Sequence, residues 1–484
     1  MSRRKSTSSV PGTATVDTLS PSTNTQAGNE HQQPNLITTL SSPSNDWSSG
    51  KGLIPGRETL GPLFLMISTP IFSIVFYHVC VHLQGNFIRF IKQVFQNGFF
   101  STLYTIWPTP WDLTAWKLIV SFLLFELFLM KYVPGDTFKA TITPKGNQPI
   151  YTVNGMKCYL ITLFTLVTLT ALGWIRPAVV YDKFGNIISS MNVLAYTFCA
   201  VLYIKGHVAP STSDSGTNGN FMIDFYWGME LYPRILGWDV KMFTNCRAGM
   251  MFWAVGILCF AHKNIEIHQG TLSLGMAINV ILQLIYISKF FYWEMGYMCS
   301  MDIQHDRAGY YICWGCLVWV PSVYTSHSFY LATHAPSISI WTGIFIFILG
   351  FACVWINYDA DNQRYLVRQT KGKCTFWGKS TPPKVLHAQY TTSKGEVCKS
   401  ILLVDGWWAV SRHFHYLPEI LGAFFWSLPA LNTSFVAPYF YVIFLTILLV
   451  DRAFRDDDRC QKKYGIYWDE YCKEVPYRIV PGLL

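Results

Sequence analysis

The residues best suited to chemistry in this chain lie between Leu402 and Glu419, just before an apolar run that ends at Pro429. Five ionisable side chains occur there: Asp405, Arg412, His413, His415 and Glu419. Ionisable groups are costly inside a bilayer, so within apolar sequence they are functional candidates. The stretch predicts a site for a polar ligand. A membrane anchor, with its tryptophans in the interfacial belt and its basic groups facing lipid headgroups, explains the same composition.

Two arginines, Arg364 and Arg368, are spaced one helical turn apart. If the helix that begins near Trp341 continues past the membrane, both guanidinium groups lie on one face. Such a pair suits a phosphate, because each planar guanidinium group can donate two hydrogen bonds to its oxygens. The arginines belong to a basic segment, residues 358–399, whose other interpretation is a solvated cytoplasmic loop beside acidic lipids.

The composition places these residues in a membrane protein. Of 484 residues, 51% are hydrophobic and only 13% are charged, which is too apolar for a water-soluble globule of this length. The net charge of +9 does not indicate nucleic-acid binding, because the basic residues lie in the N-terminal segment, in loops and near the C-terminus. The 13 cysteines are mostly single, and Cys313-Trp-Gly-Cys316 lacks a second pair, so we assign no metal.

Apolar segments long enough to cross a hydrocarbon core of about 30 Å recur from Leu60 onward. They predict an all-α polytopic membrane protein of about ten transmembrane helices. The segments lie near residues 60–82, 114–133, 157–176, 188–205, 248–262, 270–292, 311–332, 338–357 and 436–450, with 401–430 as one more span or a re-entrant pair. An even number places both termini on one side, and the basic residues at both ends favour the cytosol.

The ends and loops complete this organisation. Residues 1–57, rich in Ser, Thr, Pro, Asn and Gln, are expected to form a disordered cytosolic tail without a cleavable signal peptide or transit peptide. Residues 58–484 are expected to form the membrane domain, and the compact apolar C-terminus is expected to fold back on the helices. Asn432-Thr-Ser434 is a formal glycosylation sequon in a short luminal loop, whose closeness to the membrane disfavours its use.

Several long motifs resemble the sterol reductase family, which includes the Δ14- and Δ7-sterol reductases and the lamin B receptor. The resemblance covers about residues 60–484. It rests on Gly219-Asn-Phe-Met-Ile-Asp-Phe-Tyr-Trp-Gly-Met-Glu-Leu-Tyr-Pro-Arg234, Gly406-Trp-Trp-Ala-Val-Ser-Arg-His-Phe-His-Tyr416, Asp456-Asp-Asp-Arg-Cys-Gln-Lys-Lys-Tyr-Gly465 and Val475-Pro-Tyr-Arg-Ile-Val-Pro-Gly482.

Within that family, residues 239–247, 301–325 and 412–419 are most similar to the plant-like Δ7-reducing branch. Many relatives have Gly-Trp-Trp-Gly and Arg-His-x-Asn-Tyr-x-Gly-Asp where this chain has Ala409, His415 and Pro418-Glu419, and Leu-Asn-Pro-Arg where it has Leu231-Tyr-Pro-Arg234. These departures weigh against Δ14 specificity. They leave the contact expected at His415 open.

The resemblance implies a multi-pass enzyme of sterol biosynthesis in the endoplasmic reticulum membrane. It would use NADPH to saturate the C7=C8 bond of a Δ5,7-sterol. Because an unactivated alkene cannot accept a hydride directly, the plausible route protonates one alkene carbon and delivers hydride to the resulting carbocation. Such a site needs an acid, a nicotinamide and little water.

The resemblance also implies the site residues. The cofactor would be bound in the C-terminal part, about residues 340–484, by Arg364, Arg368, Leu403, Trp408, His415, Tyr416, Asp456, Cys460, Gln461, Lys462, Lys463, Tyr464 and Tyr471. The basic groups would pair with phosphates and the aromatic rings would stack on the adenine or nicotinamide. Interfacial packing for each ring and a lipid headgroup for each base are the alternatives. Arg412 and His413 would brace this pocket.

For the proton donor the resemblance favours Tyr286, with Asp456 as its polar partner. Four neighbouring aromatic residues, Phe290, Phe291, Tyr292 and Trp293, are candidates to stabilise the developing cation. Glu294 is a rival acid. A mid-span tyrosine is otherwise a packing residue with a satisfied hydroxyl, and Glu294, Asp302, His305 and Asp306 could instead form a structural polar network.

Three other functions remain open from the sequence. The double bond reduced could be at C14 or in the side chain. The chain could be a non-enzymatic sterol-binding scaffold, although its N-terminal segment lacks an evident chromatin-reading module. A methyltransferase of the isoprenylcysteine type has a related C-terminal module, but its chain would be much shorter.

Overall fold

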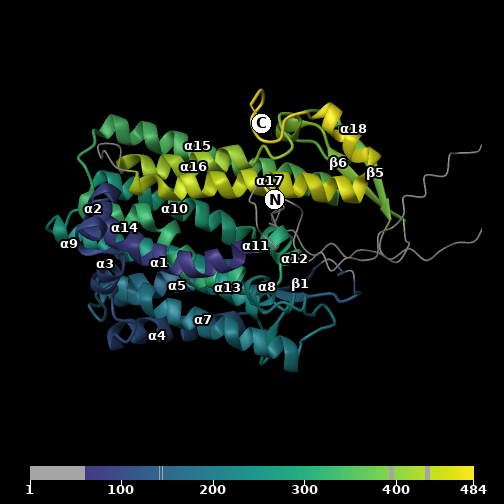
Figure 1. Ribbon diagram of the computed structural model, residues 1–484. Helices are drawn as coiled ribbons and strands as arrows, with labels where there is room; N and C mark the ends of the chain where they lie inside the picture. The colour runs from purple at the N-terminus through teal and green to yellow at the C-terminus, as the bar shows by residue number, and fades with distance from the viewer. Residues whose placement is uncertain (1–59, 141, 144, 392–396, 431–435, 484) are drawn as a thin grey trace, which may run out of the picture. The chain divides into compact units, whose positions relative to one another are not determined.

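The computed structural model describes residues 60–140, 142–143, 145–391, 397–430 and 436–483. The predicted N-terminal tail (residues 1–57) and the sequon at Asn432 lie outside these residues. Within them the chain is mostly helical, and its strands form three separate two-stranded antiparallel sheets (Figure 1). The prediction of an all-α membrane protein is confirmed, with these small sheets as its exceptions.

Seven helical segments of the described residues are long and apolar enough to cross a membrane. They are α1 (Gly61–His82), α4 (Leu113–Tyr132), α7 (Phe184–Val208), η1 with α9 (Met242–Ile267), α10 (Leu274–Tyr292), α15 (Ile340–Gln369) and η5 with α17 (Ala437–Tyr464). Each matches a predicted segment. The helical form is expected, because a segment surrounded by lipid must satisfy its backbone hydrogen bonds internally.

The three remaining predicted segments are helical but shorter or interrupted. Residues 157–176 correspond to α5 (Gly155–Ala171). Residues 311–332 correspond to α13 (Tyr310–Trp314), the π-helix η2 (Gly315–Tyr324) and α14 (Ser326–His334). Residues 401–430 contain the end of a strand, the 3₁₀ turn η3 (Gly406–Ala409), α16 (Tyr416–Ser427) and η4 (Leu428–Ala430). The number of spans beyond seven stays a prediction.

Shorter elements connect these segments. They are α2 (Phe87–Asn97), α3 (Phe99–Ile106), β1 (Asp136–Lys139), β2 (Ile150–Val153), α6 (Ala178–Asp182), α8 (Phe221–Trp227), β3 (Arg234–Ile235), β4 (Trp238–Asp239), α11 (Glu294–Met298), α12 (Met301–Gln304), β5 (Val385–Thr391), β6 (Val397–Leu403) and α18 (Ile466–Glu474). Strands pair in sequence order, with Asp136 opposite Val153, Arg234 opposite Asp239 and Val385 opposite Leu403.

The two π-helices pack against each other in the interior. One of them, η1 (Met242–Met250), lies so close to η2 that a Cβ atom on Gly249 would be 2.8 Å from the carbonyl oxygen of Cys316. Across the same contact, the Asn245 amide donates to the Cys316 sulfur at 3.2 Å. Cys313 and Cys316 are both buried free thiols. Glycine is therefore required at position 249 because any side chain would displace the facing backbone.

The C-terminal third of the chain contains the residues that the sequence singled out. The 30-residue helix α15 is about 45 Å long and exceeds a hydrocarbon core of about 30 Å, so its last turns extend beyond it. The expectation that residues 358–399 form a loop is wrong for two stretches: residues 358–369 continue α15, and Val385–Thr391 pairs with Val397–Leu403 as a hairpin. The helices α15, α16 and α17 lie alongside one another, and α18 packs on β5 (Figure 1).

The C-terminus folds back on the helices, as predicted. The backbone N–H groups of Arg412 and His413 donate to the carbonyls of Tyr477 (2.9 Å) and Arg478 (2.7 Å). The Arg412 guanidinium also pairs with Asp457 at 3.1 Å and donates to the carbonyl of Val475 at 2.8 Å. These bonds fix the segment that precedes α16 against the end of α17.

Candidate cofactor and proton-donor site

The segment before α16 is shaped by one glycine. Gly406 has a φ of +61°, and a Cβ atom there would be 2.3 Å from Oε1 of Gln363 on α15. That oxygen accepts the backbone N–H of Trp407 at 3.1 Å, and Asp405 caps the turn by accepting the N–H of Gly406 at 2.7 Å. The left-handed backbone conformation and the close approach both require glycine. The turn is therefore held directly against α15.

This turn places Trp408 beneath Arg364. The indole is buried and its Nε1–H donates to the carbonyl oxygen of Ala360 at 2.8 Å. The guanidinium carbon of Arg364 lies 4.5 Å from the centre of the indole ring, and Nη2 is 3.5 Å from a carboxylate oxygen of Asp361. Arginine stacked on an aromatic face keeps its N–H donors free at the edges. Arg364 is thus oriented but still 39% exposed.

Three rings and one carboxylate continue the site from Trp408. The His415 ring lies 5.0 Å from Trp408 and 4.3 Å from Tyr416, and Tyr416 stacks on His413 at 5.2 Å. Nε2 of His413 is 3.9 Å from Asp456. Burial lowers the pKa of the His415 imidazole to about 3 and also lowers that of His413. Both rings are therefore neutral, which suits hydrogen bonding and stacking better than pairing with phosphate.

One face of α17 supplies further polar and aromatic residues of the candidate site. Asp456 pairs with Arg459 at 2.5 Å, and the Cys460 thiol lies 3.8 Å from the same carboxylate. Further along, the Lys463 ammonium lies 4.1 Å from the ring centre of Tyr390 on β5. The Tyr464 hydroxyl is 3.4 Å from Ser400 on β6. The hairpin therefore lies against the residues that follow Asp456.

Two predicted residues do not join this face. Gln461 and Lys462 are exposed, and the helical period of 3.6 residues turns both away from the side shared by Asp456, Cys460 and Lys463. The structure thus separates Lys462 from Lys463, although the motif sets them side by side in sequence. A phosphate contact through Lys462 has no support from the arrangement.

The remaining predicted residues lie around this centre. Leu403 is buried with Val367 and Trp408, and Tyr471 is buried beside Trp468 and Val475. Arg368 is exposed, and its electrostatic neighbours are Arg364, Tyr464, Cys460 and Asp456. Among the described residues its guanidinium forms no ion pair. The two arginines on one face of α15 are thus close enough to α17 to act electrostatically on Asp456.

Tyr286 has a different partner from the one predicted. Its hydroxyl donates to Oε1 of Glu419 on α16 at 3.0 Å, not to Asp456. Its ring lies 5.7 Å from Trp253 and 5.3 Å from Trp426. Sequence reasoning placed Glu419 in the chemical stretch but did not connect it to Tyr286, because the two residues are 133 positions apart.

The aromatic neighbours predicted for Tyr286 are also different. Phe290 contacts Tyr297, Phe291 stacks on Tyr159, Tyr292 lies 6.5 Å from Tyr358, and Trp293 contacts Tyr358 and Tyr365. Phe290 lies one helical turn after Tyr286, but its ring contacts Tyr297 of α11, and the other three residues lie on other faces of α10 or just after it. Proximity in the sequence was the wrong guide, because the faces of a helix point to different neighbours.

The rival acid, Glu294, is part of a structural network. Its carboxylate pairs with Arg247 at 2.5 Å and accepts the backbone N–H of Gly155 at 2.9 Å, while Arg247 also donates to Asn154 at 2.8 Å. Asp302 pairs with Arg452 at 2.7 Å. The alternative of a polar network is therefore correct for these two acids, and Glu294 is not free to donate a proton.

The first sequence signature forms a separate structural region. Glu230 pairs with Lys205 at 2.7 Å, Asp224 accepts the backbone N–H of Asn218 at 2.9 Å, and Arg234 donates to the carbonyl of Ile150 at 2.9 Å. These polar groups hold α7, α8 and the β1–β2 hairpin together. The long motif is explained by packing and hydrogen bonding within that region.

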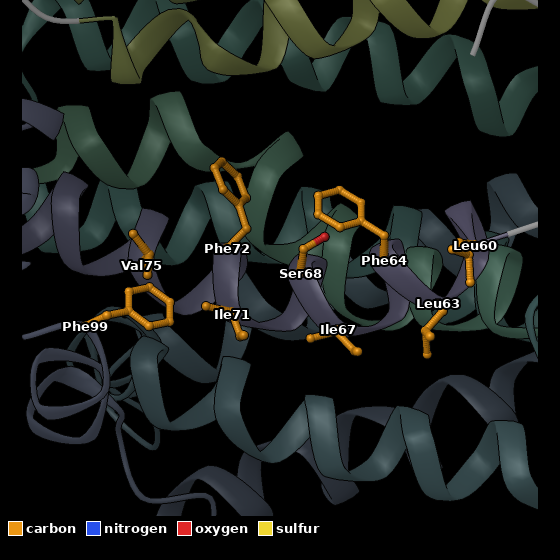
Figure 2. Close-up of a pocket in the computed structure, with 9 residues that line it drawn as sticks. All are labelled: Leu60, Leu63, Phe64, Ile67, Ser68, Ile71, Phe72, Val75 and Phe99. Carbon is orange, nitrogen blue, oxygen red and sulfur yellow. The ribbon is translucent and has the colours of Figure 1, made fainter. Parts of the chain in front are cut away.

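An apolar pocket of about 540 Å³ lies elsewhere, on the outward face of α1 (Figure 2). Its walls are apolar except for Ser68: Leu60, Leu63, Phe64, Ile67, Ile71, Phe72, Val75 and Phe99. The pocket contains none of the predicted site residues. Its open apolar surface is what a lipid-facing helix presents.

Comparison with known proteins agrees with the motifs. The Ergosterol biosynthesis ERG4/ERG24 family matches residues 56–484. The chain is 52% identical over 422 residues to 7-dehydrocholesterol reductase of Arabidopsis thaliana, covering 87% of this chain and 96% of the relative. It is 31% identical to 7-dehydrocholesterol reductase of Danio rerio, covering 90% and 92% of the two chains.

A Delta(14)-sterol reductase of Methylotuvimicrobium alcaliphilum is 33% identical over 423 residues, covering 87% of this chain and 94% of the relative. Relatives of both reducing specificities thus align over nearly the whole described region. The family match spans the arginines of α15, the Gly406 turn and α17 together. The chain therefore belongs to the ERG4/ERG24 family of sterol reductases, and is an oxidoreductase with several membrane helices.

Proposed function

We propose that this protein reduces the C7=C8 bond of Δ5,7-sterols with NADPH. The observation that carries the proposal is the convergence of Arg364, Arg368, Trp408 and Asp456 from three separate segments. The 52% identity to a 7-dehydrocholesterol reductase favours C7 over C14. The proposal includes residence in the endoplasmic reticulum membrane, both termini in the cytosol, and cofactor binding by about residues 340–484.

The donor set fits a dinucleotide phosphate. Arg364 is stacked and partly exposed, Arg368 is exposed without an ion pair among the described residues, and Lys463 lies beside two tyrosines. Exposed basic groups backed by aromatic rings can bind phosphates and bases together. When bound, the dihydronicotinamide supplies the hydride. Leu403 and Trp408 exclude water from one side, and Tyr286 holds the proton to be donated.

The residues also suit the sterol. Trp253 and Trp426 flank Tyr286, and each is 1% exposed. Their faces stabilise positive charge on a neighbouring carbon and keep water from capturing it. A flat apolar ring system is the substrate class that such apolar, water-excluding surroundings favour.

The deciding experiment is expression in a yeast strain that accumulates Δ5,7-sterols, followed by gas chromatography of the sterols. We expect the Δ5,7-diene to disappear and its ultraviolet absorbance to be lost, with Arg364→Ala reducing the conversion at comparable protein levels. An unchanged diene with folded protein contradicts the proposal. If the protein instead reduced a Δ14-sterol or a side-chain alkene in a substrate panel, its activity would be assigned to that double bond. The similarity to a Delta(14)-sterol reductase makes the Δ14 assay necessary.

Cofactor binding is tested separately, because a non-enzymatic sterol scaffold also predicts an unchanged diene. Purified protein is titrated with NADPH, using tryptophan fluorescence quenching as the signal. We expect saturable binding that Arg364→Ala and Arg368→Ala weaken. Sterol binding without any NADPH binding would favour the scaffold.

A further inference from the structure

Glu419 is the acid that contacts the predicted proton donor. The Tyr286 hydroxyl donates to its Oε1 at 3.0 Å, and this bond joins α10 to α16. Among the residues described, no other side chain hydrogen-bonds the Glu419 carboxyl, and no lysine or arginine forms an ion pair with it. The Glu419 carboxyl therefore has no ion-pair partner of its own among these residues.

Lys289 and Arg452 are the two cations that act electrostatically on Glu419, and both are engaged elsewhere; Arg452 pairs with Asp302 at 2.7 Å. The Lys289 ammonium, one turn after Tyr286, contacts the side-chain oxygen of Asn357 and lies 3.3 Å from Asp361. Asp361 in turn faces Arg364 at 3.5 Å. A partly buried carboxyl without its own cation favours the neutral acid, because the charged form lacks both solvent and a partner.

Asp456 is in the opposite situation. It pairs with Arg459 at 2.5 Å and faces His413 at 3.9 Å. A carboxyl beside a guanidinium group stays ionised and cannot act as an acid. Of the two carboxyls considered for Tyr286, only Glu419 combines contact with the phenol and surroundings that favour the protonated form.

We propose that Glu419 is a positioning residue that supplies the proton to Tyr286. In this step the phenol O–H bond breaks and its proton forms a new C–H bond at one alkene carbon. With the carboxyl protonated, the hydrogen bond across the same 3.0 Å runs from the Glu419 acid to the Tyr286 oxygen, which frees the phenol hydrogen for the alkene. The acid gives its proton to the phenol oxygen as the phenol proton leaves, so no phenolate is left. The adjacent carbon, now cationic, accepts the hydride and its electron pair from the dihydronicotinamide. After the product leaves, a proton taken up from the bulk solvent restores the Glu419 acid, so that each turnover consumes one hydride and one solvent proton.

This inference rests on the proposed function and is tested apart from it. The first readout needs no turnover: the infrared difference spectrum of wild-type protein against Glu419→Gln, without cofactor or sterol. We expect the wild type to show the carbonyl stretch of a protonated carboxylic acid that the variant lacks. Absence of that band would overturn the inference even if the protein reduces sterols.

The second readout is kinetic. We expect Glu419→Gln to lower kcat about 100-fold, within the range for loss of general acid catalysis, with KM for NADPH and sterol changed less than about twofold. Glu419→Asp should recover at least about tenfold of that loss, because it restores the acid. A retained kcat in Glu419→Gln would overturn the inference.

A double variant separates a shared step from independent effects. If Glu419 acts only through Tyr286, then Tyr286→Phe with Glu419→Gln should be no slower than Tyr286→Phe alone. Multiplied losses would show that Glu419 acts elsewhere and would overturn the inference. If wild-type protein reduces no sterol at all, the proposed function fails, while the infrared result still decides the state of Glu419.

Discussion

Arg247 and Arg364 are the same residue type in two contrasting surroundings. Arg247 is fully buried, pairs with Glu294 and donates to Asn154, so its charge is neutralised inside the protein. Arg364 is 39% exposed, lies over the Trp408 ring at 4.5 Å from its centre, and faces the Asp361 carboxylate at 3.5 Å. A buried charge paired with an opposite charge fixes helices in place, whereas an oriented but partly exposed charge can bind an anion.

The comparison extends to the acids. Glu294 accepts from Arg247 and Gly155, whereas Glu419 has only the Tyr286 hydroxyl among the described residues. Glu294 is the first residue of α11, and Glu419 lies in the first turn of α16. The difference is the number of partners, and it separates an acid that holds the structure from one that can exchange a proton. Counting charged residues in apolar sequence would treat the two alike.

The variant with the largest expected effect is Arg247→Met, which removes the buried cation. It leaves Glu294 buried without its cation, which costs about 3–5 kcal/mol. Since domains are stable by only about 5–15 kcal/mol, we expect a large fall in thermal unfolding temperature and loss of folded protein. Fluorescence-detected gel filtration after heating in detergent measures both.

The matched control for that variant is Arg176→Met. Arg176 contacts two acids, Asp182 at 2.8 Å and Glu266 at 2.6 Å, but its side chain is 53% exposed. We expect almost no change in unfolding temperature, because solvent screens such pairs. If Arg176→Met and Arg247→Met lowered the unfolding temperature equally, the distinction between buried and exposed ion pairs would be contradicted.

A second variant tests the binding arginines. We expect Arg368→Ala to raise KM for NADPH about 10–100-fold, corresponding to about 1.5–3 kcal/mol for a lost charge-assisted hydrogen bond. The unfolding temperature should stay within error, because Arg368 is exposed and forms no ion pair among the described residues. Lys462→Ala is the control, since Lys462 faces away from Asp456, and should change KM less than twofold. If Lys462→Ala raised KM more than Arg368→Ala did, the face of α17 that binds the cofactor would be the one with Lys462, not the one with Asp456.

The smallest expected effect concerns a buried hydrogen bond between α4 and α5. Thr162 donates to Oε1 of the buried Glu126 at 2.6 Å, joining α5 to α4. We expect Thr162→Val to lower the free energy of unfolding by about 1–2 kcal/mol, because Glu126 loses that hydrogen bond in a buried site. Thr162→Ser keeps the hydroxyl and should lose less. Equal stability of Thr162→Val and wild type in thermal unfolding would show that this bond contributes nothing.

Much of the fold could be predicted from hydropathy, because a long apolar run has few alternatives to a helix in lipid. Hydropathy did not predict the helical extension to Gln369, because residues 358–369 are mostly polar; the shared face of Arg364 and Arg368 was predicted only on the condition that the helix continues. The β5–β6 hairpin was missed. Its alternation, with Leu386, Ala388 and Leu402 buried or half-buried, is short and lies within a strongly basic segment that suggested a loop.

The sequence by itself determined the membrane helices, the grouping of basic and aromatic residues near the C-terminus, and the family. Local patterns suffice there, because helix formation in lipid and the spacing on one helix depend on neighbouring residues. Only the tertiary structure decided that Tyr286 contacts Glu419 and not Asp456, and that Glu294 is sealed by Arg247. These pairings depend on which helix faces pack together, and residues far apart in sequence contribute equally to that packing.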